Sequence, residues 1–463
     1  MSTHLKAAVH NLGCKVNACE AEAMSRLLAD AGYELVPFED YADIYVINTC
    51  SVTNIADRKS RQMLHRARKM NPDCVVIACG CYAQAAARDL LDSGEADMVI
   101  GNDRRGLIAV LLDDYLKARD EGESAGRAAE PVCAVADLSK KREYEELPYG
   151  RTGEYTRAFV KVQDGCDQFC SYCIIPYTRG RVRSRDMDKV CREASELARD
   201  GYTEVVLTGI HLSSYGRDFD ERTYEGGPWL IELIRRVAAV PGIERVRLGS
   251  LEPNLITERT ARELSQIKEL CPHFHLSLQS GSDAVLKRMN RHYTAAEYLE
   301  KCDLLRRYFE HPSITTDVIV GFPGETEQEF QETAQLVKAA GFYELHVFKY
   351  SKREGTRAAE MPGQVDEAEK ARRSHELIAL GQSLSRLHAG YYIGRTVSVL
   401  TEECRVIEGR RFITGFTPEY IRAALPVSED SCPEAGRLIR ARGTALLEGN
   451  VLECAPDQDD STL

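Results

Sequence analysis

The chain of 463 residues lacks any apolar run near the length of about 18 residues that a membrane-spanning helix requires. Its first thirteen residues also lack the apolar stretch and the small-residue cleavage site of a secretory signal. Hydrophobic residues make up 43% and charged residues 29% of the chain, as in ordinary globular proteins. We therefore expect a cytoplasmic protein with no membrane partner, and the length favours two or three domains.

A net positive charge is also missing, because the formal net charge is −12. At face value this argues against a nucleic-acid partner. Two local runs are nevertheless basic. Residues 58–70 carry six basic and no acidic side chains, which suits a solvated helix face as well as RNA contact. For the second run we favour contact with RNA phosphates, because it directly follows a cysteine-rich loop. The predicted RNA-binding residues are Arg179, Arg181, Arg183 and Arg185.

Cysteine, in contrast, is plentiful: there are sixteen, which predicts metal binding in a reducing compartment and not a disulfide framework. Cys166, Cys170 and Cys173 lie within eight residues, with three and then two residues between them. This spacing suits neither a strand nor one helix face, and it predicts a loop around an iron–sulfur cluster. Three ligands leave one iron of a cubane open to a small molecule. The alternative is three buried free cysteines, which have no reason to gather in such a loop.

The first 115 or so residues alternate short apolar runs with helical stretches, which predicts βαβ units and a parallel sheet. Strands are expected at residues 6–12, 44–49, 75–78 and 98–100, and helices at 20–31, 53–70, 82–91 and 104–117. Cys14, Cys50 and Cys81 each follow a strand, and ligands bind outside the carboxyl ends of such strands. These three thiols could converge on a second cluster. The pattern alone is weak, because Cys19, Cys74 and Cys79 lie nearby and any of these cysteines could be a plain core residue.

A second βα series begins after residue 155, with strands expected at 158–162, 204–207, 245–248, 274–278, 316–320 and 344–348. Six such units predict a partial barrel, smaller than the eight units of a complete TIM barrel, with its site at the carboxyl ends of the strands. After residue 387, short β-like runs separated by Gly and Pro predict a small antiparallel barrel. The expected division is an N-terminal domain over 1–117, a linker over 118–152, the partial barrel over 153–387, the small barrel over 388–455 and an acidic tail over 456–463.

The cysteine spacing, with Tyr172 before the last thiol, resembles the radical S-adenosylmethionine (SAM) enzymes. The longer string Asp164–Gly180 is similar to their methylthiotransferase branch, as are the strings around the three N-terminal thiols, residues 12–17, 48–53 and 80–84. The resemblance covers most of the chain. It implies that Cys14, Cys50 and Cys81 hold a second [4Fe–4S] cluster, and that the C-terminal barrel is an RNA-binding TRAM domain.

The resemblance also implies the chemistry. The cluster on Cys166, Cys170 and Cys173 would bind SAM and cleave it to a 5′-deoxyadenosyl radical, and the second cluster would carry the sulfur, so two SAM molecules are used per turnover. Glycines at strand ends let backbone approach a ligand, although ordinary turn glycines are an equal alternative at any one position. The candidate SAM-binding residues are Tyr172, Thr208, Gly209, Ser250, Gln279, Ser280, Gly321 and Gly324.

Members of the family act on threonylcarbamoyladenosine in tRNA, on isopentenyladenosine in tRNA, or on an aspartate of a ribosomal protein. The string Leu-Gly-Cys-Lys-Val-Asn at 12–17 and the run at 178–185 resemble the first branch. This implies methylthiolation of adenosine 37 beside the anticodon, with the tRNA anticodon stem-loop and an electron donor such as flavodoxin or ferredoxin as partners. An RNA-binding iron–sulfur electron carrier is the alternative outside enzymes, but a pure carrier would not need two open irons.

Overall fold

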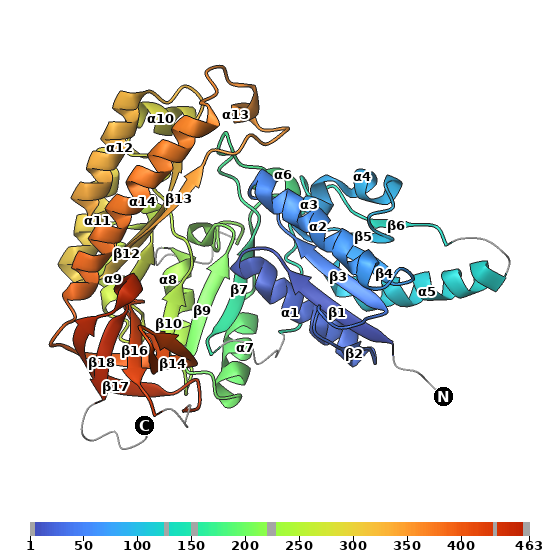
Figure 1. Ribbon diagram of the computed structural model, residues 1–463, viewed down its shortest axis with the longest axis horizontal. Coiled ribbons are helices and arrows are strands. Elements are labelled where there is room, and N and C mark those ends of the chain that lie inside the picture. The colour runs from blue at the N-terminus through green and yellow to red at the C-terminus, as the bar shows by residue number, and fades with distance from the viewer. Residues whose placement is uncertain (1–4, 125–128, 150–155, 220–227, 429–432, 457–463) are drawn as a thin grey trace.

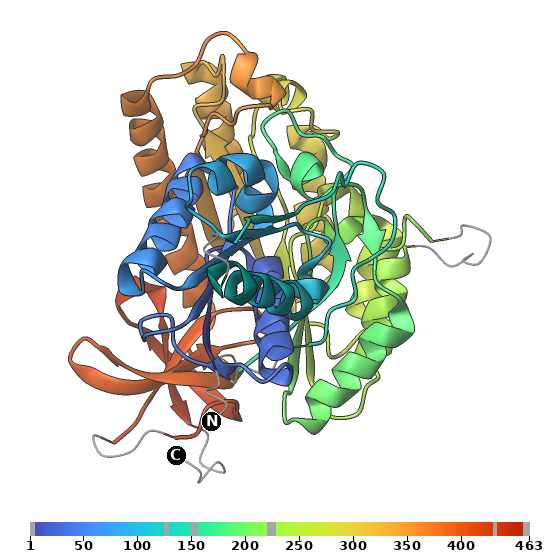
Figure 2. The same cartoon turned by 90° about the vertical axis from the view of Figure 1, so that its right-hand side faces the viewer.

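The computed structural model describes residues 5–124, 129–149, 156–219, 228–428 and 433–456, and Figure 1 shows three domains in chain order. The N-terminal α/β domain lies beside a central βα domain, and a small β-barrel packs under the central domain. In Figure 2 the N-terminal domain stands in front of the central one. None of the helices in these ranges combines the length and apolar character that a bilayer crossing requires.

The N-terminal domain is a parallel sheet in the order β2-β1-β3-β4-β5-β6. Its strands are β1 (Lys6–Asn11), β2 (Glu34–Leu35), β3 (Ile44–Thr49), β4 (Val75–Cys79), β5 (Met98–Ile100) and β6 (Val132–Ala134). Its helices are α1 (Lys15–Asp30), α2 (Asn54–Met70), α3 (Gly80–Ala85), α4 (Ala87–Asp92), η1 (Arg105–Leu107) and α5 (Ile108–Ser124).

Successive side chains of a strand point to opposite faces of the sheet, and both faces here are apolar. Val76 of β4 packs in one core with Leu64 of α2, whereas Ile77 packs in the other with Met24 of α1 and Leu112 of α5. The predicted parallel sheet is therefore confirmed, with helices on both faces. Cys79 is fully buried in β4, as a core residue should be.

Two expectations for this domain differ from the structure. Strand β6 lies within the stretch 118–152 that was expected to be a linker, and it pairs with β5 along the sheet edge. The stretch 118–152 has mixed charge and no sustained period, so only the pairing with β5 reveals this strand. The helix expected over 82–91 is split into α3 and α4, because Ala86 leaves helical geometry at φ −116° and ψ 29°.

The central domain holds six parallel barrel strands with helices between them. The strands are β7 (Ala158–Asp164), β9 (Glu204–Gly209), β10 (Arg245–Leu248), β11 (His273–His275), β12 (Ser313–Val320) and β13 (Glu344–Lys349), and β8 (Arg183–Ser184) is a short antiparallel addition to β7. The helices are α6 (Ile175–Thr178), α7 (Met187–Arg199), η2 (Leu212–Ser214), α8 (Trp229–Ala238), η4 (Pro253–Leu255), α9 (Glu258–Ser265), α10 (Asp283–Arg288), α11 (Ala295–Tyr308), α12 (Glu327–Ala340), α13 (Arg357–Glu360) and α14 (Glu367–Gly390).

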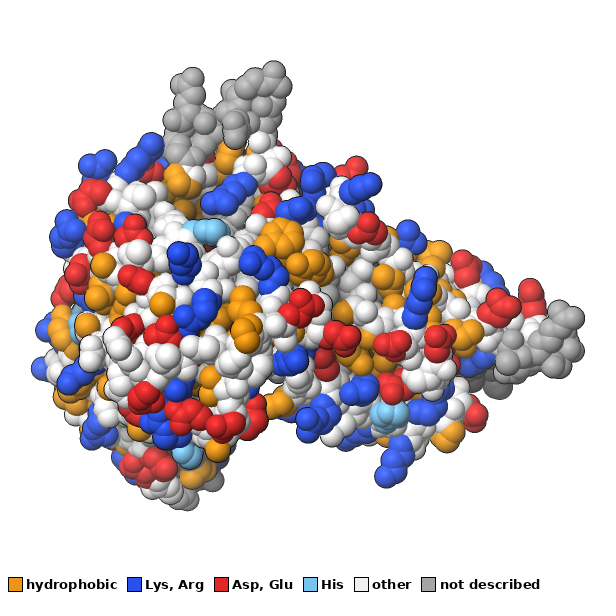
Figure 3. Space-filling view, turned by 90° about the horizontal axis from the view of Figure 1, so that it is seen from above, with side chains coloured by type: hydrophobic (Ala, Val, Ile, Leu, Met, Phe, Trp, Pro, Cys, Tyr) orange, Lys and Arg blue, Asp and Glu red, His pale blue; other side chains and the backbone are white. Residues whose placement is uncertain are grey.

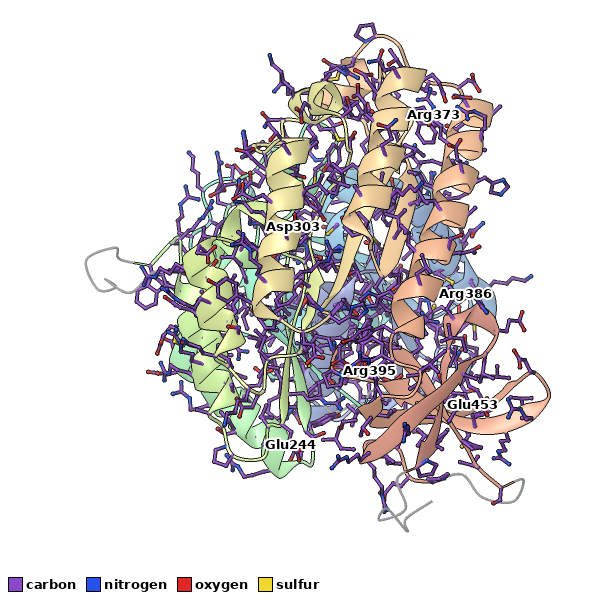
Figure 4. All side chains as sticks on the ribbon, turned by 90° about the vertical axis from the view of Figure 1, so that its left-hand side faces the viewer. Glu244, Asp303, Arg373, Arg386, Arg395 and Glu453 are labelled. Carbon is purple, nitrogen blue, oxygen red and sulfur yellow. The ribbon has the colours of Figure 1, made fainter. Side chains whose placement is uncertain are left out.

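The expected partial barrel is confirmed. Strands β10, β9 and β7 pair in one sheet and β11, β12 and β13 in another. A bridge between Leu251 and Leu276 joins the two after β10 and β11. Helix α12 starts at the expected capping box, with Thr326 accepting from the Glu329 amide, and it ends at Gly341 with φ +59°. Helices α11, α12 and α14 stand side by side on the outer face in Figure 4, with Arg373 near the upper end of α14.

The C-terminal segment is a closed barrel in the order β14-β15-β16-β18-β17. The strands are β14 (Thr396–Ile407), β15 (Arg410–Phe416), β16 (Arg422–Pro426), β17 (Leu438–Leu446) and β18 (Leu452–Pro456), with η5 (Glu448–Asn450) before the last. Arg247 of β10 ties it to the central domain, since it pairs with Glu204 at 2.7 Å and donates to the carbonyl of Pro418 at 2.8 Å. Apart from Pro456, the acidic tail lies outside the described residues.

Candidate functional site

The thiols of Cys166, Cys170 and Cys173, here the loop triad, follow β7 at the carboxyl end of the barrel. Gly165 opens the loop at φ +71°, where a Cβ atom would lie 1.8 Å from the carbonyl oxygen of Arg181, so only glycine fits. The Cys166 amide donates to the carbonyl of Gly180 at 3.0 Å and closes the loop. The three half-buried thiols are thereby held on one short loop.

The loop triad is chemically suited to a cation. Burial raises the pKa of the Cys166 thiol to about 12, and the neighbouring Cys170 adds to this effect. Burial likewise raises the pKa of Cys173. Arg291 donates to the Cys170 sulfur at 3.3 Å and is itself held by Glu252 at 2.7 Å. Because the thiolate is the metal ligand, these side chains need a positive partner to ionise at neutral pH.

The thiols of Cys14, Cys50 and Cys81, here the strand-end triad, come from three neighbouring strands. Cys14 precedes α1 after β1, Cys50 follows β3, and Cys81 lies in the first turn of α3 after β4. Burial raises the pKa of Cys50 to about 11, and the nearby Cys81 and Cys14 raise it further. Gly80 makes the turn before Cys81 with φ +90°. Only glycine fits there, because a Cβ atom would lie 2.2 Å from the Thr49 carbonyl oxygen. The structure thus brings these three thiols together, as expected.

The spacing of both triads fits a cluster better than a single ion. Two thiolates on one ion, each about 2.3 Å from it, are at most about 4.6 Å apart. Among the residues that the structure describes, neither triad is a group whose sulfur atoms all lie within 4.8 Å of one another. Three thiolates suit three of the irons of a [4Fe–4S] cluster. The donor set therefore fits the implied cofactor at both places.

The side chain of Arg179 joins the strand-end triad to the central domain. It comes from the segment after the loop triad, is fully buried, and donates through Nε to the Cys81 sulfur at 3.2 Å. Its other nitrogens donate to Glu20 of α1 at 2.8 Å and to Asp164 of β7 at 3.1 Å. Lys161 bridges the same two carboxylates, at 2.7 Å each. A buried ionic cluster therefore spans the contact between the N-terminal and central domains.

The carboxylates of this cluster stay ionised. Burial alone would raise the pKa of Glu20, but the charges of Arg105, Arg179 and Lys161 lower it to about 2. For Asp164, burial is likewise outweighed by Lys161 and the arginines, and its pKa lies well below the usual range. Sequence reasoning missed Glu20, Lys161 and Asp164. The sequence offered one indication of this cluster: Lys161 and Asp164 are the charged residues of an otherwise largely apolar strand.

The arginine run does not form one surface. Arg183 is buried and pairs with Asp164 at 3.4 Å, while the largely buried Arg185 donates to Glu146 at 2.9 Å and pairs with Glu193. Arg181 is 42% exposed, lies 4.6 Å above the ring of Phe169 and reaches Asp167 at 3.5 Å. Buried guanidinium groups cannot touch a phosphate in this structure. The expectation of RNA contact is therefore corrected for Arg179, Arg183 and Arg185, and it is kept for Arg181.

A cavity of 220 Å³ lies between the two cysteine loops. One wall is Val52 and Thr53, which follow Cys50, and the opposite wall is Tyr172 with Cys173. The remaining lining residues are Ile174, Ile175, Gln279, Asp317, Ile319, Phe348, Lys349, Tyr350 and Ser351. A small ligand here would touch the loop triad and face the segment that carries Cys50.

The eight candidate SAM-binding residues divide in the structure. Tyr172 and Gln279 line this cavity, and Gln279 holds the unusual φ of +69°. Ser280 is fully buried, and its hydroxyl lies 3.2 Å from the hydroxyl of Thr333 on α12. The other residues lie at strand ends or turns without lining the cavity: Thr208, Gly209, Ser250, Gly321 and Gly324. The turn at Gly321 is held by Glu325, which accepts from its amide at 2.9 Å and pairs with Arg373.

Arg353 was also missed. It follows β13, is 7% exposed, and reaches across to the N-terminal domain. It donates to the Ser51 hydroxyl, pairs with Asp57 at 2.7 Å and donates to Asn54 at 2.9 Å. Ser51 is next to Cys50, so Arg353 positions that loop against the barrel. Nothing in the local sequence around Arg353 indicates a contact some 300 residues away.

The basic run 58–70 lies on α2, whose preceding segment lines the cavity. Its exposed members are Arg58, Lys59, Arg61, Arg66 and Lys69, whereas Arg68 pairs with Asp97 at 2.7 Å. Figure 3 shows the face seen from above Figure 1, where basic side chains are interspersed with acidic and hydrophobic ones. The run thus offers exposed cations near the cavity, and both interpretations of it stay open.

Comparisons with known proteins give one consistent result. Residues 160–337 match the family described as Radical SAM superfamily, and residues 6–101 match Uncharacterized protein family UPF0004. The chain is 40% identical over 456 residues to the threonylcarbamoyladenosine tRNA methylthiotransferase MtaB of Bacillus subtilis (strain 168), with 97% of each chain covered. It is 36% identical to the protein of the same name from Aquifex aeolicus (strain VF5), covering 94% of this chain and 99% of that one.

Two further matches set the limits of this result. A tRNA-2-methylthio-N(6)-dimethylallyladenosine synthase of Moorella thermoacetica is also 36% identical, with 95% of this chain and 97% of that protein covered. Among solved structures, the radical S-adenosylmethionine methyltransferase TsrM of Kitasatospora setae matches with a TM-score of 0.53 at 14% identity, over 77% of each chain. The last likeness concerns the fold alone.

Proposed function

The chain belongs to the radical SAM methylthiotransferase family, and we propose that it adds a methylthio group to C2 of N6-threonylcarbamoyladenosine at position 37 of tRNA. The observation that carries this proposal is the near full-length identity of 40% to a relative of that name, together with a cavity lined by Cys173 of the loop triad and by Val52 and Thr53, which follow Cys50 of the strand-end triad. A carrier of electrons would need neither the second open site nor the cavity between the two.

We assign the six thiols to two [4Fe–4S] clusters. When bound, the clusters would supply the electron that cleaves SAM and the place where the transferred sulfur is held. The chain's own contribution is position. Arg291 and Arg179 each place a cation against one ligand sulfur, and such hydrogen bonds tune the potential of a cluster. Tyr172 and Gln279, on the cavity wall, are the residues that we assign to SAM.

The contact between domains sets the distance between the two triads. The buried Arg179 cluster and the Arg353 contacts both join the N-terminal domain to the barrel. The reaction rate falls steeply when the substrate is held at the wrong distance, because the reacting atoms must meet in one geometry. We propose that these arginines keep SAM, substrate carbon and sulfur in line.

For the remaining parts we propose partners from the same reasoning. An anticodon stem-loop presents unpaired bases that can be turned out into a pocket. Its phosphates would approach Arg181 and the exposed cations of α2, and the C-terminal barrel would act as a TRAM domain on the stem. An electron donor such as flavodoxin or ferredoxin would reduce the loop-triad cluster in the cytoplasm. Because α5 runs to Ser124 and β6 pairs with β5, the first domain extends past residue 117 to residue 134, and boundaries near residues 153 and 387 then separate the other two.

The test is mass spectrometry of tRNA nucleosides from cells that lack the gene. The methylthio form of threonylcarbamoyladenosine should disappear and its unmethylthiolated precursor should accumulate, while methylthio-isopentenyladenosine stays unchanged. Reintroducing the wild-type gene should restore the product, and a gene with Cys170→Ala should not. Loss of the isopentenyl product alone would overturn the substrate in favour of the other named group of relatives.

A further inference from the structure

Three side chains on the inner wall of the barrel form a compact group of metal-binding type. His275 ends β11, and Asp317 and His346 occupy paired positions on β12 and β13. One ligand atom from each lies within 4.8 Å of the other two, and among the described residues this is the one set of three His, Cys, Asp or Glu side chains so placed. Two imidazoles and one carboxylate are a known ligand set for divalent transition metals.

The distances within the group suit a shared ion. Two ligands each about 2.0–2.2 Å from a tetrahedral zinc are about 3.4 Å apart. The Nε2 atom of His275 lies 3.2 Å from Oδ2 of Asp317, and the rings of His275 and His346 have centroids 5.7 Å apart. Both Nε2 and Oδ2 can therefore reach one ion without rearrangement of the strands.

The group also has the outer support that metal-binding histidines usually show. The other ring nitrogen of His275, Nδ1, lies 3.0 Å from the hydroxyl of Thr315, and that hydroxyl is 3.2 Å from Nε2 of His273. A hydrogen bond at Nδ1 fixes the ring so that Nε2 points towards Asp317. The side chains of His275 and Asp317 are 13% and 29% exposed, so the group is shielded but can be reached.

We propose that His275, Asp317 and His346 bind one divalent transition-metal ion, zinc or ferrous iron by the chemistry of the ligands, and that its open position takes a carboxylate of the substrate. Asp317 also lines the cavity beside Tyr172 and Cys173, so the ion would face the cavity that we assign to SAM, which the target base must approach to react. Three protein ligands leave at least one position open. The threonylcarbamoyl group carries a carboxylate and the isopentenyl group does not; this second part rests on the proposed function.

The first experiment loads the protein with both clusters, removes loose metal, and adds zinc. We expect about one zinc per chain, bound by nitrogen and oxygen at about 2.0–2.2 Å in X-ray absorption, with no sulfur at about 2.3 Å. His346→Gln and Asp317→Asn should each lose this zinc, and Thr315→Val should weaken binding by roughly tenfold. His346 is exposed, so its variant should fold normally.

The matched control is His388→Gln. His388 stacks on His311 with centroids 4.2 Å apart, and within the described part of the chain neither ring belongs to a set of three possible metal ligands. This variant should keep the zinc. Two outcomes would overturn the site. One is an equal zinc content in the wild type, His346→Gln and Asp317→Asn, and the other is sulfur among the zinc ligands. His275 and Asp317 would then be a simple hydrogen-bonded pair.

The second experiment measures binding of anticodon stem-loops by fluorescence anisotropy, with and without zinc. Zinc should strengthen binding of the loop with threonylcarbamoyladenosine severalfold, have no effect on the loop with isopentenyladenosine, and have no effect on either in Asp317→Asn. Equal effects on both loops would overturn the carboxylate assignment. The two proposals can fail separately. If the protein binds zinc at this group but cells lacking the gene show unchanged threonylcarbamoyladenosine, the metal site is retained and the proposed function is rejected.

Discussion

The loop triad is drawn from eight consecutive residues, whereas the strand-end triad is drawn from residues 14, 50 and 81, which follow three different strands. The loop triad needs only a local turn, closed by Gly165 and one backbone hydrogen bond. The strand-end triad needs the parallel order of β1, β3 and β4, and then Arg179 from the other domain against Cys81. One set of ligands is thus a property of a short segment, and the other is a property of the fold.

The largest effect is expected from removing the loop triad. A variant with Cys166→Ala, Cys170→Ala and Cys173→Ala should bind about four irons in place of about eight and should cleave no SAM. Iron analysis and detection of 5′-deoxyadenosine check this. Cys133→Ala, at an exposed cysteine, is the control and should keep about eight irons. Complete loss of iron from the triple variant would mean one shared site.

Removing the strand-end triad should separate the two activities. With Cys14→Ala, Cys50→Ala and Cys81→Ala, 5′-deoxyadenosine should still form, because these thiols lie outside the barrel, but no methylthio product should appear. Nucleoside mass spectrometry of reconstituted reactions measures both. Product at the wild-type rate would show that the N-terminal thiols are structural.

Arg179→Gln should test how far the strand-end triad depends on the domain contact. The substitution removes a buried positive partner of Glu20 and Asp164. Breaking a buried ion pair lowers the free energy of unfolding by about 3–5 kcal/mol. We expect a lower melting temperature and a changed electron paramagnetic spectrum of the strand-end cluster, measured in the variant without the loop triad.

The control for that variant is Arg181→Ala, two residues away and exposed to solvent, whose effect on unfolding should stay within about 0.5 kcal/mol. If the two arginine variants melt alike and leave the spectrum unchanged, the domain contact does not govern the strand-end triad.

The smallest effect is expected for RNA binding. Arg181→Ala should weaken tRNA binding and lower the log–log salt slope by about 0.7–0.9, the contribution of one phosphate contact. SAM cleavage without tRNA should be unchanged. The matched control is Arg236→Ala on α8, whose side chain is 40% exposed against 42% for Arg181, and it should bind tRNA like the wild type. An unchanged salt slope for Arg181→Ala would remove the last member of the arginine run from the RNA surface.

Much of the fold could be read from the chain because it is set by local patterns. Apolar runs predicted β3, β5 and β10 at the observed residues, and the capping box at Thr326 predicted the start of α12. The loop triad was equally visible, since its spacing alone excludes a strand or a helix face. These features depend on interactions between residues close in sequence.

The tertiary structure alone decided which charges are internal. The sequence presents Arg179, Arg181, Arg183 and Arg185 as one basic run, but the fold buries three of them against carboxylates as distant as Glu20 and leaves Arg181 in solvent. Likewise His275, Asp317 and His346 are separated by about 70 residues and meet only because β11, β12 and β13 are neighbours. A side chain's charge is a local property, whereas its partner and its exposure are set by how distant segments pack.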